Sequence, residues 1–312
     1  MSAAASKQNQ KRPKRVARID QNDFRGESRR DAKKLEGRAN ALSTGVKAYL
    51  QYRTRKIVRD LTQELRRTGK VRKSVPVQKA TREEKRFARL MAFYGLRQIT
   101  DTGREYVGSE WVIPNTYISD YLNEKTILLQ QLDSSIEKEF REAVGRALAE
   151  WMKETPRPTI GQISERLRRW LTVSNQKDAP TELKPLGNRF TIEGLGARAR
   201  TIARTEINAA RNYGRVEAGK LLGREFKVWL ASNDGKSGNR HHEALNGQIV
   251  GMNEWFENPK TKAKLRYPGD PKARSKLGVA SEVINCRCSV RPITRQMAAM
   301  LERDGLLLGG DE

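Results

Sequence analysis

Residues 226–230 read Phe-Lys-Val-Trp-Leu, and at this point the spacing of apolar side chains changes from about 3.6 residues to two. Phe226, Val228 and Leu230 alternate with a lysine and a tryptophan, which predicts a half-buried β-strand. From Gly196 to about Leu222, by contrast, apolar side chains recur at helical spacing. A long helix followed by short strands predicts an α+β domain.

Downstream of this strand, the pattern predicts the remaining elements of a small sheet. His241 to Leu245 has the length of one helical turn, and Gln248 to Met252 has that of a short strand. Cys286 to Ile293 is expected to be the final strand. Strands from such separated positions are expected to form a short antiparallel sheet backed by the 196–222 helix.

The chain before residue 195 is predicted to be mainly helical. An apolar stripe at spacings of about four or seven residues consists of Leu42, Val46, Leu50, Ile57, Leu61 and Leu65. Thr81-Arg82-Glu83-Glu84 has the pattern of a capping box and predicts a second helix to about Leu96. Segment 102–118 contains two glycines and a proline and is expected to be a loop.

These patterns and the composition divide the chain into five predicted segments. They are a disordered basic arm (1–38), an α-helical region (39–173), a linker (174–194), an α+β domain (195–295) and a C-terminal tail (296–312).

The net charge of +25 and the isoelectric point of about 10.3 predict a polyanionic partner. The charge is uneven. Residues 1–80 hold 23 Lys and Arg against 7 Asp and Glu, residues 81–194 hold 18 against 17, and residues 195–312 hold 21 against 13. The positive field therefore lies mainly at the N-terminal end.

Six basic residues precede the first acidic one, Asp20, and we expect them to contact double-stranded DNA. They are Lys7, Lys11, Arg12, Lys14, Arg15 and Arg18. Because the arm has few aromatic residues for base stacking, the contacts are expected to be with phosphates, without sequence specificity. The alternative is a solubilising tail.

No membrane partner is expected, because no run of eighteen apolar residues is present and the N-terminus has no hydrophobic signal segment. The chain has only two cysteines, Cys286 and Cys288, and their spacing does not suit a structural disulfide. A protein of the cytosol, or of a virion assembled there, is the simpler interpretation.

The two cysteines and the only two histidines are candidate zinc ligands. Structural zinc sites use four ligands, and their cysteine pairs are usually separated by two to four residues rather than one. In a strand, however, residues i and i+2 face the same way, so Cys286, Cys288 and His242 could reach one metal. His241 or Asp234 would then be the fourth ligand. The alternative has no cofactor: two small buried cysteines and a hydrogen-bonded structural histidine.

A catalytic role is not expected for these residues. A His-Asn-His type of metal-dependent nuclease would suit the basic charge, but a base and separate metal ligands are hard to assemble from two adjacent histidines. A cysteine nucleophile with His242 as its base would need a lowered thiol pKa, and no feature of the sequence indicates one.

Several short blocks, in this order, resemble the phage head-morphogenesis domain named after the F protein of bacteriophage Mu. They include Ala203-Arg204-Thr205-Glu206, Asn212-Tyr213-Gly214-Arg215, His242-Glu243-Ala244-Leu245-Asn246-Gly247, Tyr267-Pro268-Gly269-Asp270-Pro271 and Glu282-Val283-Ile284-Asn285-Cys286-Arg287-Cys288. The resemblance covers roughly residues 195–295. Many members of the family carry His-Pro where this chain has Val283-Ile284, so a fourth zinc ligand is missing there.

The resemblance implies a structural minor head protein of a tailed phage, located in the capsid interior, and in the host cytoplasm during assembly. It implies association with the portal protein, with scaffold or major capsid protein as further partners, and a role in head assembly, DNA packaging or DNA ejection. It implies no catalytic reaction. The alternatives are a basic metal-dependent nuclease and a free-standing nucleic-acid-binding module.

Overall fold

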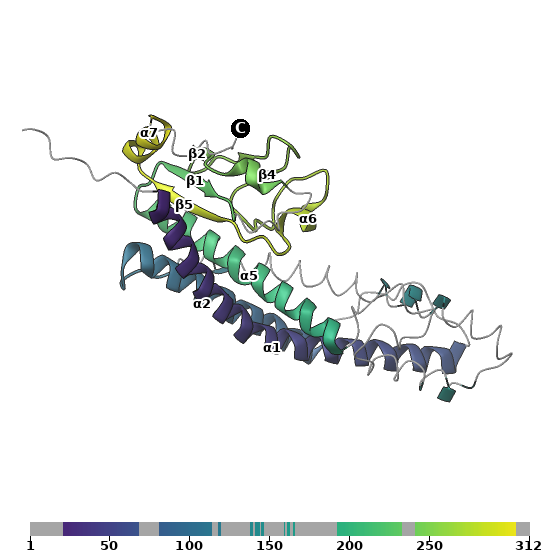
Figure 1. Cartoon of the computed structure of the whole chain (residues 1–312). Coiled ribbons are helices and arrows are strands. Elements are labelled where there is room, and N and C mark those ends of the chain that lie inside the picture. The colour runs from purple at the N-terminus through teal and green to yellow at the C-terminus, as the bar shows by residue number, and fades with distance from the viewer. Residues whose placement is uncertain are drawn as a thin grey trace, which may run out of the picture.

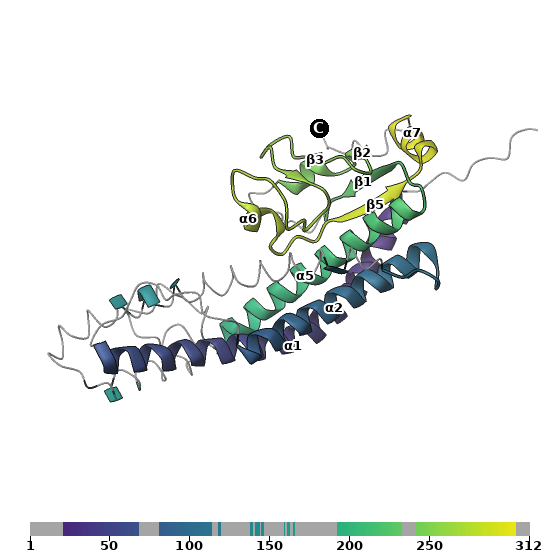
Figure 2. The same cartoon turned by 180° about the vertical axis from the view of Figure 1, so that it is seen from behind.

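The computed structural model describes residues 21–68, 81–113, 192–232 and 241–303, and scattered residues between 118 and 165. Three long helices lie along one another, and a small β-rich unit covers part of one of them (Figures 1 and 2). The predicted α+β class is confirmed. No helix of the described part combines the length and apolar composition needed to cross a membrane.

The helical layer consists of α1 (Gln21–Thr68), α2 (Arg82–Val107) and α5 (Ile192–Leu221). The predicted apolar stripe of α1 is confirmed from Leu42 to Leu61, whose five members are at most 2 % exposed; the side chain of Leu65 lies outside the description. The stripe packs on the other two helices through Phe87, Met91, Leu195, Ala199, Ala203 and Ile207. Burial of this seam, rather than helix propensity, holds the three helices together.

Helix α1 begins earlier than predicted. Residues 21–38 are helical, whereas 1–38 was expected to be disordered; residues 1–20 lie outside the described chain. Two contacts with α2 and α5 explain part of the difference: Arg38 pairs with Asp101 at 2.9 Å, and Glu36 pairs with Arg204 at 2.9 Å. Charge patterning alone does not reveal such partners.

Helix α2 begins as predicted and ends later. The Thr81 hydroxyl accepts the Glu84 N–H at 3.2 Å, and the Glu84 carboxylate accepts the Thr81 N–H at 2.6 Å, so the capping box is confirmed. The helix continues to Val107, whereas it was predicted to end near Leu96. The prediction of a loop that begins at residue 102 was therefore wrong for residues 102–107. Gly103 does not break the helix, because it makes room for the Trp111 ring, which a Cβ there would overlap.

The β-rich unit has a three-stranded antiparallel sheet of order β2-β1-β5. Its strands are β1 (Phe226–Leu230), β2 (Ile249–Gly251) and β5 (Ser289–Ile293), with Val228 opposite Ile249 on one side and Arg291 on the other. A separate two-stranded pair joins β3 (Phe256–Glu257) to β4 (Lys264–Leu265). The expected turn is the 3-10 helix η4 (His242–Leu245), and the helix α6 (Val279–Val283) precedes the cysteines.

Strand β1 is buried on both faces, not half-buried as predicted. Val228 and Trp229, which point to opposite faces, are both 0 % exposed. One face is covered by α7 (Arg295–Arg303), whose Ala298 and Leu301 pack against Val228. The predicted C-terminal tail of 296–312 therefore begins with a packed helix that completes the sheet's second core.

Helix α5 connects the two parts of the molecule. Its N-terminal half lies in the core with α1 and α2, and its C-terminal half packs against β5 (Figure 1). Gly219 lets the sheet approach closely, since a Cβ there would crowd the Pro292 ring. The predicted backing of the sheet by this helix is confirmed, and it fixes the segment that carries the cysteines.

Candidate functional site

One face of α5 binds the backbone of the segment that carries the two cysteines. The residues that do so, Thr205, Asn208 and Asn212, share a helical face because they are three and four residues apart. The Thr205 hydroxyl accepts the N–H of Asn285 at 2.8 Å. The Asn208 amide donates to the carbonyls of Cys286 and Cys288 at 2.9 and 3.2 Å.

Asn212, which is completely buried, extends this set of hydrogen bonds to the sheet. Its amide nitrogen donates to the carbonyls of Pro268 and Cys288, and its oxygen accepts the N–H of Val290 at 3.1 Å. These asparagine amides occupy the cysteine carbonyls, so the cysteines stand before β5 and not within it. The expectation of a strand from Cys286 was therefore wrong by three residues.

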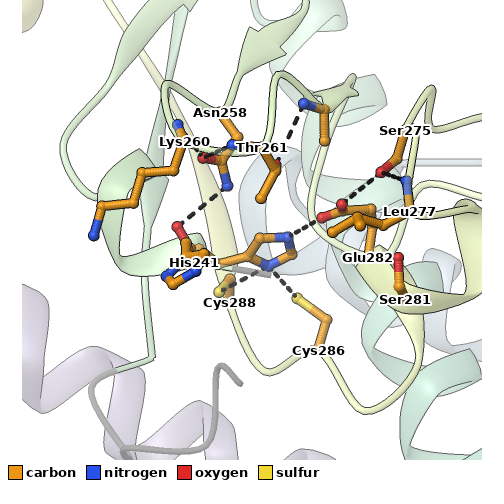
Figure 3. A network of polar contacts seen from close by, with 12 residues as sticks. His241, Asn258, Lys260, Thr261, Ser275, Leu277, Ser281, Glu282, Cys286 and Cys288 are labelled. Atoms are coloured by element: carbon orange, nitrogen blue, oxygen red, sulfur yellow. Dashed lines mark hydrogen bonds and ion pairs between the residues drawn. The ribbon is translucent and has the colours of Figure 1, made fainter. Parts of the chain in front are cut away.

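The three predicted metal ligands meet in the interior of the domain (Figure 3). Nδ1 of His242 lies 3.5 Å from Sγ of Cys286 and 3.9 Å from Sγ of Cys288. The three residues are only 1–5 % exposed. Among the described residues, this is the one cluster of His, Cys, Asp and Glu side chains that could hold a metal.

Glu282 contacts this imidazole on the side opposite the two cysteines, which are labelled with it in Figure 3. Its Oε2 lies 3.0 Å from Nε2 of His242, and its Oε1 accepts the Ser275 hydroxyl at 2.7 Å. With the carboxylate oxygen as the acceptor for an N–H at Nε2, the other ring nitrogen, Nδ1, faces the sulfurs. The carboxylate itself is 0 % exposed.

The surroundings favour the thiolate form of Cys288. A hydrogen bond from the Cys286 side chain holds the pKa of Cys288 well below its ordinary value. The nearby His242 and the backbone of Ser232 lower this pKa further, while burial acts in the opposite direction. A thiolate is the form that binds metals and attacks electrophiles.

The other predicted ligands do not join the cluster. The side chain of His241 is 43 % exposed, and its Nδ1 contacts Glu243 at 3.1 Å instead of the cysteines. Asp234 lies outside the described residues. So do all six predicted DNA-binding residues of the arm, from Lys7 to Arg18.

A second connection joins α1 to the cysteine segment. The Arg204 guanidinium binds both carboxylate oxygens of Glu36, at 2.9 and 3.3 Å, and donates to the Asn285 side chain at 3.0 Å. The hydrogen bond from Arg204 lowers the pKa of Glu36. Asn285 has a left-handed backbone with φ of 57°, a conformation that asparagine tolerates better than most residues.

The sequence pattern did not assign roles to Glu282, Asn208 or Asn212. All three lie inside or beside blocks that carry the resemblance, and their helical or loop positions gave no periodic signal. The signal that could have found the asparagines is their spacing on one helix face: Asn208 lies three residues after Thr205, and Asn212 lies four residues after Asn208. Glu282 had no such signal, because its partner is forty residues away.

Comparison with known proteins places a family match on this part of the chain. Residues 162–291 match the family described as Phage Mu protein F like protein. The resemblance inferred from the sequence blocks is thus confirmed: this part of the chain is similar to the phage head-morphogenesis family. The match begins before α5, earlier than the predicted domain start at residue 195.

One similar curated protein is the uncharacterized protein YqbB of Bacillus subtilis (strain 168), which is 32 % identical over 98 residues. The aligned part covers 31 % of this chain and 30 % of the relative, so the chain spans less than a third of that protein. No solved structure matches the chain.

Proposed function

We propose that this chain is a structural minor head protein of a tailed phage. It would associate with the portal protein in the capsid interior, with scaffold or major capsid protein as further partners, and act in head assembly, DNA packaging or DNA ejection. The observation that carries this proposal is the match of residues 162–291 to the Mu F-like family.

The geometry of the Cys/His cluster supports a structural role in preference to a nuclease. A general base must come within hydrogen-bond reach of the water or group that it activates. His242 is 1 % exposed, and both of its ring nitrogens already face protein atoms. A phosphodiester therefore has no access to it in this structure.

The charge distribution supports a DNA-binding arm. The six basic residues between Lys7 and Arg18 precede a helical layer that is held by its own buried seam. Removal of residues 1–20 would leave Gln21, the first residue of α1, and all contacts of Glu36 and Arg38 in place. This truncation tests the arm and leaves α1 complete. A deletion of residues 1–38 would instead remove the first part of α1 together with Glu36 and Arg38.

Head association is tested by the protein content of purified particles from the phage that encodes the chain. We expect the chain in DNA-filled heads, in far fewer copies than the major capsid protein, and in a complex with the portal protein after mild disassembly. Particles that are infectious and contain no trace of the chain would contradict the proposal.

DNA binding is tested by anisotropy of a labelled duplex over a range of salt concentrations, with the full chain and the 21–312 truncation. Each lost phosphate contact should reduce the slope of log K against log salt by about 0.9, so loss of six basic residues reduces it by at most about 5. The matched control replaces three exposed basic residues of α2, Lys85, Arg86 and Arg89, by Gln. An unchanged slope in the truncation would remove the arm from the proposal while leaving the head association to its own test.

A further inference from the structure

We infer that His242, Cys286 and Cys288 form a zinc-binding site, with Glu282 holding the histidine as an outer partner. This inference is independent of the proposed role in the phage head. It names a ligand set of two thiolates and one imidazole, to which a water molecule adds the fourth ligand of a tetrahedron.

The first argument is the separation of the ligand atoms. Zinc binds sulfur at about 2.3 Å and imidazole nitrogen at about 2.0–2.1 Å, so a tetrahedral angle places N and S about 3.6 Å apart. The two observed N–S distances are 3.5 and 3.9 Å, and all three ligand atoms lie within 4.8 Å of one another. Both N–S separations are therefore close to the value that a tetrahedral zinc ion requires.

The second argument is the direction in which the imidazole is held. Metal-binding histidines usually donate their other ring N–H to a carboxylate or carbonyl, which fixes the tautomer. The Glu282 carboxylate accepts a hydrogen bond from Nε2 of His242, and the Ser275 hydroxyl in turn donates to Glu282 and orients it. The Nδ1 lone pair is thereby aimed at the space between the sulfurs.

The third argument is that both sulfurs converge on one ring nitrogen. A neutral imidazole nitrogen has one in-plane lone pair and accepts one good hydrogen bond. Here two thiols converge on the same Nδ1, in an interior where both are at most 5 % exposed. A cation between the three ligand atoms satisfies all three groups together.

The fourth argument concerns the supports of the two cysteines. The carbonyls of Cys286 and Cys288 are bound by the side chain of Asn208, and Cys288 by that of Asn212 as well. The loop is thus fixed from α5 without any contribution from the sulfurs. The thiols remain directed inward at the histidine, as metal ligands on a rigid support should be.

The direct test is to purify the full chain, remove metal with a chelator under reducing conditions, and titrate it with Zn²⁺ against a chromophoric competitor. We expect about one zinc ion per chain. Titration with Co²⁺ should give the charge-transfer bands of thiolate ligands and the visible bands of tetrahedral cobalt. The chelator-treated chain should also melt at a lower temperature, because ligation free energy adds to folding.

The neighbouring histidines supply a matched pair of variants. His242→Ala should abolish zinc binding, whereas His241→Ala should retain it, since His241 is turned toward Glu243. Glu282→Gln keeps the shape of the outer partner and should weaken zinc binding about 10- to 100-fold without changing the stoichiometry.

The wild-type experiment keeps the inference falsifiable even where a variant fails to fold. A folded chain that takes up no zinc, or a Co²⁺ complex whose spectrum lacks thiolate bands, would overturn the site. Equal zinc binding by the His241→Ala and His242→Ala proteins would overturn the assignment of His242.

Discussion

Glu282 accepts a hydrogen bond from His242 at 3.0 Å, on the side of the imidazole opposite the two cysteine sulfurs. Both residues are buried, and they come from segments forty positions apart. The pair therefore links η4 to α6 inside the β-rich unit. Because a carboxylate in such a place has no water to replace a lost partner, each group depends on the other.

Replacement of Glu282 by Ala should reduce the free energy of unfolding by about 2–4 kcal/mol, because the buried His242 N–H and the half-buried Ser275 hydroxyl both lose this acceptor. Urea unfolding of the full chain measures the change. Glu302→Ala removes an exposed carboxylate of α7 and should change stability by less than about 0.5 kcal/mol. Equal effects of the two replacements would show that the buried pair contributes nothing specific.

Asn212→Leu should destabilise the chain by about 2–3 kcal/mol, since Pro268, Cys288 and Val290 each lose a buried hydrogen bond to this side chain. Asn253→Leu, at an exposed position of the loop after β2, is the control. The measurement is the urea midpoint at a constant m-value. A midpoint that does not move in Asn212→Leu would mean that water replaces those hydrogen bonds.

The sequence predicted the elements whose signal is periodic. The stripe from Leu42 to Leu61 and the alternation in β1 each repeat a short spacing, and each predicted the type of its element. In the stripe the buried residues also follow from the spacing, whereas in β1 the covering of the second face by α7 does not. The proximity of His242 to the cysteines was also predicted. The geometric reason given for it, that both cysteines lie in one strand, was wrong, because β5 begins only at Ser289.

What the sequence did not predict depends on partners far along the chain. Gly103 looks like a helix breaker until the Trp111 ring is placed against it. Glu282 looks like an ordinary acidic residue of a short helix until His242 is placed forty residues upstream. Non-local contacts of this kind leave no spacing rule in the chain, so only the folded structure reveals them.

The two helical glycines Gly37 and Gly103 should respond to alanine in opposite directions. Gly37 has no atom within 4 Å of a Cβ, so Gly37→Ala should stabilise α1 by about 0.5–1 kcal/mol through helix propensity. Gly103→Ala should destabilise by about 1–3 kcal/mol, because its methyl group meets the Trp111 ring. Thermal unfolding of both variants decides the point, and stabilisation by both would contradict the packing assigned to Gly103.

Purified full-length chain should show no cleavage of plasmid DNA with Mg²⁺, Mn²⁺ or Zn²⁺, because His242 is buried and both of its ring nitrogens face protein atoms. Agarose gels of supercoiled plasmid over several hours measure nicking. Sustained turnover by the wild type that is lost in His242→Ala, with DNA binding retained, would instead establish the nuclease alternative.

Lys227 should make the chain more stable as the pH rises from about 8 toward 10.5. Burial in β1 lowers the pKa of Lys227 to about 8, and the nearby Lys220 and Arg266 act in the same direction, while Asp270 and Glu217 oppose them. Its ammonium group donates to the Arg266 carbonyl at 2.8 Å and lies over the Phe256 ring.

In that pH window the unfolded chain, with an ordinary lysine pKa, binds more protons than the folded chain, so the free energy of unfolding increases with pH. The increase due to Lys227 is at most about 3 kcal/mol. Lys227→Met removes the titrating group, so the wild type should gain stability relative to this variant between pH 8 and 10.5. Urea unfolding at several pH values under reducing conditions measures the difference, and parallel curves for the two proteins would show that the buried amine keeps an ordinary pKa.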